Sequence, residues 1–197
     1  MHAQTSSRAG RREWVGLAVL ALPCLVYSMD LSVLNLAVPA LSADLRPSSA
    51  ELLWIIDVYG FMVAGALLTM GTLGDRIGRR RLLMIGAACF AAASVLAAFA
   101  PSAELLIAAR ALLGLAGATL APSTLALISS MFADPRERTT AIGVWVASFS
   151  AGAAVGPVAG RRAPGVLLVG LGLPHRAAGH GAAAGRRAAA AARVARS

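Results

Sequence analysis

Apolar residues dominate five stretches of the chain, and each stretch is long enough to form a helix that crosses a bilayer. A spanning helix needs about 20 mainly apolar residues. The stretches cover approximately residues 14–38, 52–73, 82–100, 105–131 and 141–160. The pattern predicts an all-α integral membrane fold over residues 14–160, with a short cytoplasmic segment at 1–13 and a different kind of segment at 161–197.

Basic residues precede the first predicted helix and occur in every second connection after it. Arg8, Arg11 and Arg12 precede the first span, four arginines stand between the second and third spans, and two more precede the fifth. The other connections carry a net negative charge or no basic residue. Because basic loops stay on the cytoplasmic side, we expect a cytoplasmic N-terminus. The first apolar run exceeds the core of a signal peptide and no A-x-A site follows, which favours a retained helix.

Composition supports the membrane assignment. Hydrophobic residues make up 58% of the chain and charged residues only 14%, against roughly 25% charged in soluble domains. Cys24 and Cys89 each fall inside an apolar span, so we interpret them as small buried side chains rather than a disulfide or metal ligands. No metal-binding or nucleophilic constellation is visible, and we expect neither an enzyme nor a bound cofactor.

Three ionisable residues lie within the predicted spans: Asp30, Asp57 and Arg110. A charge at membrane depth costs about 2.5–3.5 kcal/mol, so by default it indicates function. Counting residues from the span ends places all three at similar depth, where a carboxylate can exchange a proton or hold a cation. Two structural alternatives stay open. Asp30 can simply pair with Arg110, and Asp57 can be a partly hydrated residue beside Trp54 and Tyr59 near the interface.

A basic, glycine-punctuated segment connects the second and third spans with the pattern G-x-L-x-D-R-x-G-R-R-R. It is not a phosphate-binding loop, because no G-K-[ST] ending follows and no strand precedes it. We expect its charged side chains to tether neighbouring helix ends on the cytoplasmic side. The candidate residues are Gly71, Gly74, Asp75, Arg76, Gly78, Arg79 and Arg80.

Small residues recur at every fourth position of the fifth span. A stripe of this kind allows a neighbouring helix to approach closely. Prolines within the fourth and fifth spans are expected to bend their helices. The stripe consists of Ser148, Gly152, Gly156 and Gly160, and the prolines are Pro122 and Pro157.

Four of these segments resemble ordered motifs of the major facilitator superfamily. Residues 71–81 resemble the signature loop between its helices 2 and 3. Residues 29–39 resemble the first-helix motif of its fourteen-helix drug:proton antiporters, with Ser32 at the threonine position. Residues 110–114 resemble the fourth-helix motif that the family links to proton transfer, with Leu113 replacing glutamine. Residues 152–160 resemble the fifth-helix antiporter motif through Gly152, Gly156, Pro157 and Gly160.

The resemblance implies the first five helices of a bundle built from inverted three-helix repeats. It also implies efflux of hydrophobic or cationic molecules across the bacterial plasma membrane, driven by the proton gradient and coupled through Asp30, Asp57 and Arg110. The expected partners are the lipid bilayer, the substrate and a C-terminal half of the transporter. One half-bundle cannot enclose a route, so we expect no transport by this chain alone. A non-transporting fragment or helper, or a metabolite carrier of the same superfamily, is the alternative.

Residues 161–197 differ from the rest of the chain, with seven arginines, no acid and no aromatic residue. One interpretation is a disordered basic tail that binds anionic lipid or nucleic acid. The other is a frame change at residue 160 or 161, because the fifth-helix motif continues with glycine where this chain has Arg161. We favour the frame change and expect no nucleic-acid partner.

Overall fold

The computed structural model describes residues 8–162, and within them every regular element is a helix. All five helices are long and apolar enough to cross a membrane. Each predicted span falls on one helix, apart from residues 99 and 100. The all-α membrane fold is therefore confirmed. The helices are α1 (Arg11–Leu45), α2 (Ser49–Ile77), α3 (Arg79–Ala98), α4 (Ala103–Met131) and α5 (Pro135–Arg162).

Polar caps fix where the helices begin. The Ser48 hydroxyl accepts a hydrogen bond from the backbone N–H of Glu51 at 3.3 Å, and the Glu51 carboxylate accepts one from the Ser48 N–H at 2.7 Å. This reciprocal capping box starts α2. The Ser102 hydroxyl caps α4. Ahead of α5, the Asp134 carboxylate accepts two backbone hydrogen bonds, and Pro135 occupies the first helical position, where its missing N–H is harmless.

The connection between α2 and α3 is much shorter than the glycine-rich pattern predicted. Gly71, Gly74 and Asp75 all belong to the last turns of α2, and α3 already begins at Arg79. Only Gly78 separates the two helices, with φ of 98°. A side chain at this residue would be strained, which is why a glycine stands here. The glycines earlier in the motif therefore belong to a helix rather than a flexible loop, and Gly74 among them packs against Leu82 of α3.

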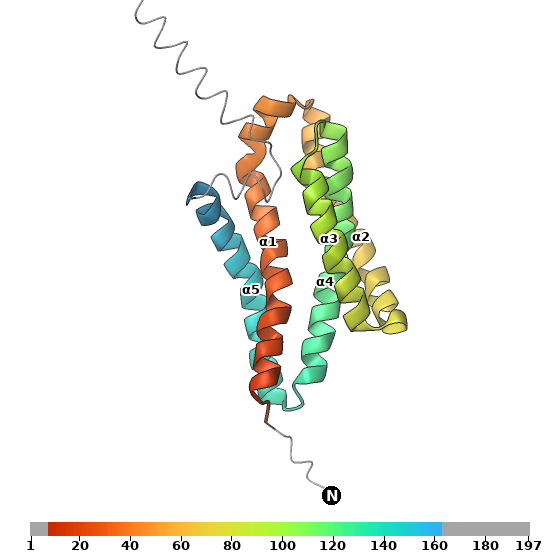
Figure 1. Ribbon diagram of the computed structural model, residues 1–197, viewed down its shortest axis with the longest axis vertical. Coiled ribbons are helices and arrows are strands. Elements are labelled where there is room, and N and C mark those ends of the chain that lie inside the picture. Colours follow the sequence, from red (N-terminus) through yellow and green to blue (C-terminus); the bar gives the residue numbers. More distant parts are fainter. Residues whose placement is uncertain (1–7, 163–197) are drawn as a thin grey trace, which may run out of the picture.

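Helix α4 occupies the centre of the bundle. In the most apolar 18-residue stretch of α4, 56% of the residues are buried. The corresponding share in the other four helices is 22–28%. Helices α2 and α3 both pack on α4, whereas α5 packs along α1, which in turn touches α4 (Figure 1). The start of α1 and the α2–α3 and α4–α5 connections lie towards one end of the bundle (Figure 1). The three segments that the sequence predicted to be basic and on one side of the membrane thus lie at the same end of the bundle.

Small residues make the two most extensive helix contacts possible. A Cβ atom added to Gly152 would overlap the carbonyl oxygen of Leu25, and one added to Gly156 would overlap the hydroxyl of Ser32. The predicted small-residue stripe therefore packs against α1. Gly160 belongs to the same helix, beyond the side chains that the structure describes. On the other side, a Cβ at Gly114 of α4 would lie 2.9 Å from Cβ of Met62 in α2.

The segment after α5 lies outside the described residues. Positions 161 and 162 are still helical, but residues 163–197 are not described. The domain boundary at residue 160 and both interpretations of the basic segment therefore stay predictions.

Candidate functional site

The centre of the candidate site is an ion pair between α1 and α4. Nη1 of Arg110 donates a hydrogen bond to Oδ2 of Asp30 over 2.6 Å. The side chains are only 2% and 11% exposed, respectively. A buried charge is tolerated when a counter-charge accompanies it, so each residue accounts for the presence of the other. The structure thus brings together two of the three ionisable residues that the sequence singled out.

An aromatic ring covers the guanidinium of Arg110. The Cζ atom lies 4.6 Å from the ring centroid of Tyr59 in α2, a distance typical of a cation–π contact. Tyr59 is itself only 1% exposed. Arg110 is therefore held by one carboxylate oxygen and one ring face, supplied by two different helices.

Several hydrogen-bonding atoms around this pair lack partners. Nε and Nη2 of Arg110, together with the hydroxyl of Tyr59, are buried and form no hydrogen bond with any described residue. Most buried polar atoms in proteins are paired, so three unpaired ones in one place need an explanation. They leave Arg110 able to accept a second anionic or carbonyl partner without first leaving Asp30.

Two glycines of α4 allow Tyr59 and Tyr27 to approach this helix closely. Gly114 and Gly117 follow Arg110 by four and seven residues and so share its helix face. A Cβ at Gly117 would lie 2.8 Å from the Tyr27 ring and 3.3 Å from the Tyr59 hydroxyl. The local sequence of α4 thus supplies one long cation, followed by glycines at the positions that the two tyrosines approach.

A row of aromatic side chains continues from the ion pair into α5. The Tyr27 ring lies 5.6 Å from Tyr59 and 6.0 Å from Phe149 between centroids, and Phe149 lies 5.0 Å from Trp145. Sequence reasoning missed this row. Tyr27 stands three residues before Asp30 on the same face of α1, a signal that was available. Nothing local links α5 to it, because that contact exists only through the packing of α5 on α1.

Asp57 is not part of this arrangement. Its side chain is exposed, and it makes no ion pair or hydrogen bond with any described residue. Tyr59 is two positions further along α2, and residues two apart face different directions. The structure therefore separates Asp57 from the Asp30–Arg110 pair, and its participation in coupling stays a prediction.

The basic motif forms a compact tether between α2 and α3. Nη2 of Arg79 donates to Oδ1 of Asp75 over 2.6 Å, across the single-residue connection. The stem of Arg79 also packs on Gly74, where a Cβ would lie 3.0 Å from Cδ. The predicted tethering of helix ends is present. Arg76 and Arg80 take no part in this ion pair and are exposed.

The two cysteines differ in their surroundings. Both are free; Cys24 is fully buried, whereas Cys89 is exposed on α3. The expectation that both are buried is wrong for Cys89, because an apolar span places residues of one character on every face of its helix. Burial then depends on which face meets a neighbour.

Comparison with known proteins identifies relatives of this chain. The profile of the Major Facilitator Superfamily matches residues 20–170. The multidrug efflux pump LfrA of Mycolicibacterium smegmatis is 55% identical over 156 residues, which cover 79% of this chain and 31% of that protein. The methyl viologen resistance protein SmvA of Salmonella typhimurium is 46% identical over 157 residues, or 80% of this chain and 31% of SmvA. The puromycin resistance protein pur8 of Streptomyces alboniger is 42% identical over 149 residues, or 76% and 30%.

These matches confirm the resemblance that the four motifs indicated. The chain spans about a third of the length of the curated relatives it matches. It is a multi-pass membrane protein by its five apolar helices. The matched region includes the ion pair, the basic motif and all of the fifth-helix motif, and the chain belongs to the Major Facilitator Superfamily.

Proposed function

We propose that these helices form part of a transporter that exports hydrophobic, cationic small molecules in exchange for protons. The observation that carries the proposal is the buried Asp30–Arg110 pair, in which one carboxylate compensates an arginine that keeps two unpaired donor groups. Charged residues in membrane spans commonly mark ion or substrate pathways. The relatives support the substrate class, since their names refer to multidrug efflux and to resistance against methyl viologen and puromycin.

Protonation of Asp30 changes which charges are buried. While Asp30 is ionised, it compensates Arg110. Asp30 stops compensating Arg110 once it binds a proton, or once a cationic substrate replaces Arg110 beside its carboxylate. Arg110 is then a buried charge with only the Tyr59 ring beside it. Removing one partner of a buried pair costs about 3–5 kcal/mol. A conformation that offers Arg110 another acceptor then becomes favoured, and this difference couples protonation to the inward–outward equilibrium.

The free energies involved indicate that Asp30 and Arg110 do not separate unless another acceptor replaces Asp30. One charge crossing a potential of 100 mV supplies about 2.3 kcal/mol, which is less than the cost of an uncompensated arginine. The Tyr59 contact offsets part of that cost, since a desolvated cation–π contact contributes about 2 kcal/mol. The unpaired Nε and Nη2 atoms allow a new acceptor to bind before Asp30 is released.

Asp57 has a different place in this proposal. It lies on an exposed stripe of α2 with Leu53, Phe61 and Leu68, which are 62%, 67% and 80% exposed. A carboxylate facing lipid would be costly. We therefore assign this stripe to the contact with a C-terminal half of the transporter, where Asp57 meets a substrate or proton pathway. The Asp75–Arg79 tether would then act as a conformational latch at the cytoplasmic ends of α2 and α3.

The membrane topology follows from the arrangement of charge. The start of α1 and the α2–α3 connection, whose sequences carry these arginines, lie towards the same end of the bundle (Figure 1). The positive-inside rule places that end in the cytoplasm of a bacterial cell and the chain in its plasma membrane. The proton gradient across that membrane is the proposed energy source, and no bound cofactor is required.

Binding measurements on the purified chain test the proposal. Tetraphenylphosphonium, a hydrophobic cation, should bind less tightly as the pH falls, because protons compete for the Asp30 carboxylate. Asp30→Asn should weaken binding and abolish this pH dependence. Asp44→Asn is the matched control, since it makes the same change at an exposed position of the same helix. Unchanged pH dependence in the Asp30 variant would reject the proposed role of that residue.

The helper alternative is separated by a transport assay. Liposomes that contain only this chain should show no efflux driven by a pH gradient, because α1 to α5 line only one side of a route. Robust efflux by the chain alone would contradict this expectation. Binding of the cation without transport is the combination that the proposal requires.

A further inference from the structure

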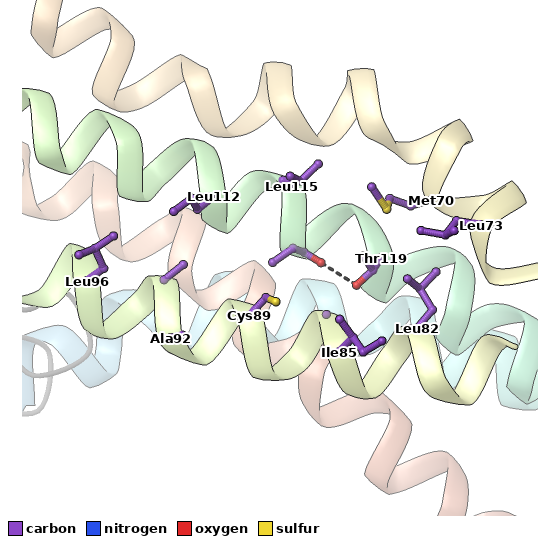
Figure 2. A pocket seen from close by; sticks show the side chains of 13 residues that line it. Met70, Leu73, Leu82, Ile85, Cys89, Ala92, Leu96, Leu112, Leu115 and Thr119 are labelled. Atoms are coloured by element: carbon purple, nitrogen blue, oxygen red, sulfur yellow. Dashed lines mark hydrogen bonds between the residues drawn. The ribbon is translucent and has the colours of Figure 1, made fainter. Parts of the chain in front are cut away.

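An apolar groove lies on the side of the bundle where α2 and α3 diverge. Both helices pack on α4 but touch each other far less. Between them remains a cavity of about 610 Å³ with α4 as its floor. Figure 2 shows Met70 and Leu73 of α2 along one side, and Ile85, Cys89 and Leu96 of α3 along the other.

The lining of this groove offers no strong polar partner to a ligand, only the weakly polar thiol of Cys89 and one hydroxyl. Its one hydroxyl belongs to Thr119, and that group already donates to the carbonyl of Ala116 at 2.7 Å (Figure 2). No carboxylate lines the groove. Ile85 is 54% exposed and Leu96 is 38% exposed, so the groove is open to its surroundings. A hydrocarbon chain fits this lining better than any molecule that needs a hydrogen bond or a counter-ion.

The groove is longer than one leaflet of a membrane and shorter than the whole hydrocarbon core. It follows α3 from Leu82 to Leu96, which at about 1.5 Å per residue is roughly 21 Å. The hydrocarbon core of a bilayer is about 30 Å thick, so one leaflet occupies roughly 15 Å. A single acyl chain that enters from the Gly78 end would therefore lie along the groove without crossing to the opposite surface.

Two arginines stand at the Gly78 end of the groove. Arg81 precedes Ile85 by four residues on α3, and Arg76 follows Leu73 by three residues on α2. Side chains at these spacings share a helix face. The two cations therefore continue the two walls of the groove beyond its apolar part.

The charge of these arginines is not neutralised nearby. Both side chains are exposed and form no ion pair or hydrogen bond with a described residue. The acid of the motif, Asp75, is already paired with Arg79. A negatively charged group would be attracted to this end of the groove, whereas a cationic drug would be repelled.

From the apolar groove and its basic end we propose that this site binds an anionic phospholipid. One acyl chain lies between α2 and α3 on the floor of α4, and the phosphate lies between Arg76 and Arg81. The lipid belongs to the leaflet on the arginine side. It would stabilise the spacing of α2 and α3, which the Asp75–Arg79 contact sets at one end only. This role is independent of the Asp30–Arg110 pair.

Native mass spectrometry of the full chain in detergent tests the site. The chain is incubated with equal amounts of phosphatidylglycerol and phosphatidylcholine, and the retained lipids are counted. We expect preferential retention of phosphatidylglycerol. The Arg76→Gln/Arg81→Gln variant should lower that preference by roughly fivefold for each arginine. Arg11→Gln/Arg12→Gln removes the same charge at the start of α1 and should leave the preference unchanged.

A second variant tests the groove itself. Ala92→Trp places a large ring among the lining residues while both arginines remain, and should reduce retention of both lipids. Cys89 provides a measurement that needs no substitution, because added phosphatidylglycerol should slow its reaction with a maleimide severalfold, and phosphatidylcholine should slow it less.

Several results would overturn the proposal. Equal retention of the two lipids would remove the role of charge, and retention that survives Ala92→Trp would remove the role of the groove. Displacement of bound lipid by tetraphenylphosphonium, with Cys89 protected by that cation instead, would assign the groove to hydrophobic cations. A phosphatidylglycerol preference that survives loss of Arg76 and Arg81 would place the headgroup elsewhere.

Discussion

Loss of either member of the Asp30–Arg110 pair is expected to destabilise the chain, and loss of both much less than the two single losses added together. The perturbations are Asp30→Asn and Arg110→Met, which keep approximate size and remove charge. Because the side chains are only 2% and 11% exposed, solvent cannot take over the role of the missing partner. Breaking a buried pair costs about 3–5 kcal/mol. The Tyr59 ring remains beside Arg110 in Asp30→Asn, so we expect about 3 kcal/mol for that variant. Arg110→Met leaves Asp30 without any such contact, and we expect about 3–5 kcal/mol for it.

The double variant defines the coupling energy between the two side chains. It removes both charges, so neither is left buried alone. Neutral interhelical hydrogen bonds in a membrane protein couple by about 0.6 kcal/mol on average and by about 1.7 kcal/mol at most. A buried ion pair should exceed that upper value, and we expect a coupling of about 2–3 kcal/mol.

Unfolding by sodium dodecyl sulfate in mixed micelles, followed by circular dichroism, measures these free energies. The matched cycle combines Arg110→Met with Asp44→Asn, an exposed aspartate at the end of α1, and should be additive. A coupling near 0.6 kcal/mol for the Asp30 cycle would refute the reasoning. The two charges would then be solvated separately, and protonation of Asp30 could not move Arg110.

Three further results are expected from the same micelle system. Gly152→Leu should destabilise the chain by about 1–3 kcal/mol, because the added side chain meets the backbone of α1. Gly143→Leu is the control and should change little, because a Cβ at Gly143 has nothing within 4 Å. Equal effects of the two variants on the unfolding free energy would contradict the packing argument. Gly78→Ala should lower the unfolding free energy by about 1–2 kcal/mol in thermal unfolding, since φ of this residue is 98°. An unchanged melting temperature would show that the connection relaxes. A maleimide should label exposed Cys89 in the folded chain and reach buried Cys24 only after unfolding; equal labelling rates would contradict the described helix faces.

The membrane-spanning segments were predictable from the sequence because the signal for a span is local. An apolar run of sufficient length must form a helix in lipid, where every backbone group needs an internal partner. The residue types in the four motifs also identified the family, which the comparison confirms. The same local signal could not place Cys89, since both faces of α3 are apolar and only packing distinguishes them.

The connection around Gly78 shows a second limit of local reasoning. Glycines and arginines near a membrane boundary suggested a loop of several residues, yet α2 and α3 continue through all but one of them. A helix can continue past the membrane boundary into water, because its backbone groups remain hydrogen-bonded within the helix. Its arginine side chains are solvated there. The Asp75–Arg79 pair, four residues apart, bridges the break.

By itself the sequence determined five membrane helices, the family, and three charged residues that needed an explanation. The tertiary structure alone decided that Asp30 meets Arg110, which lies 80 positions away, and that Asp57 meets neither. It also decided that Tyr27, Tyr59 and Phe149 gather from three helices, and that α2 and α3 leave a groove over α4. The physical reason is that helical periodicity fixes which residues share a face, whereas the small residues at the contacts fix which faces meet.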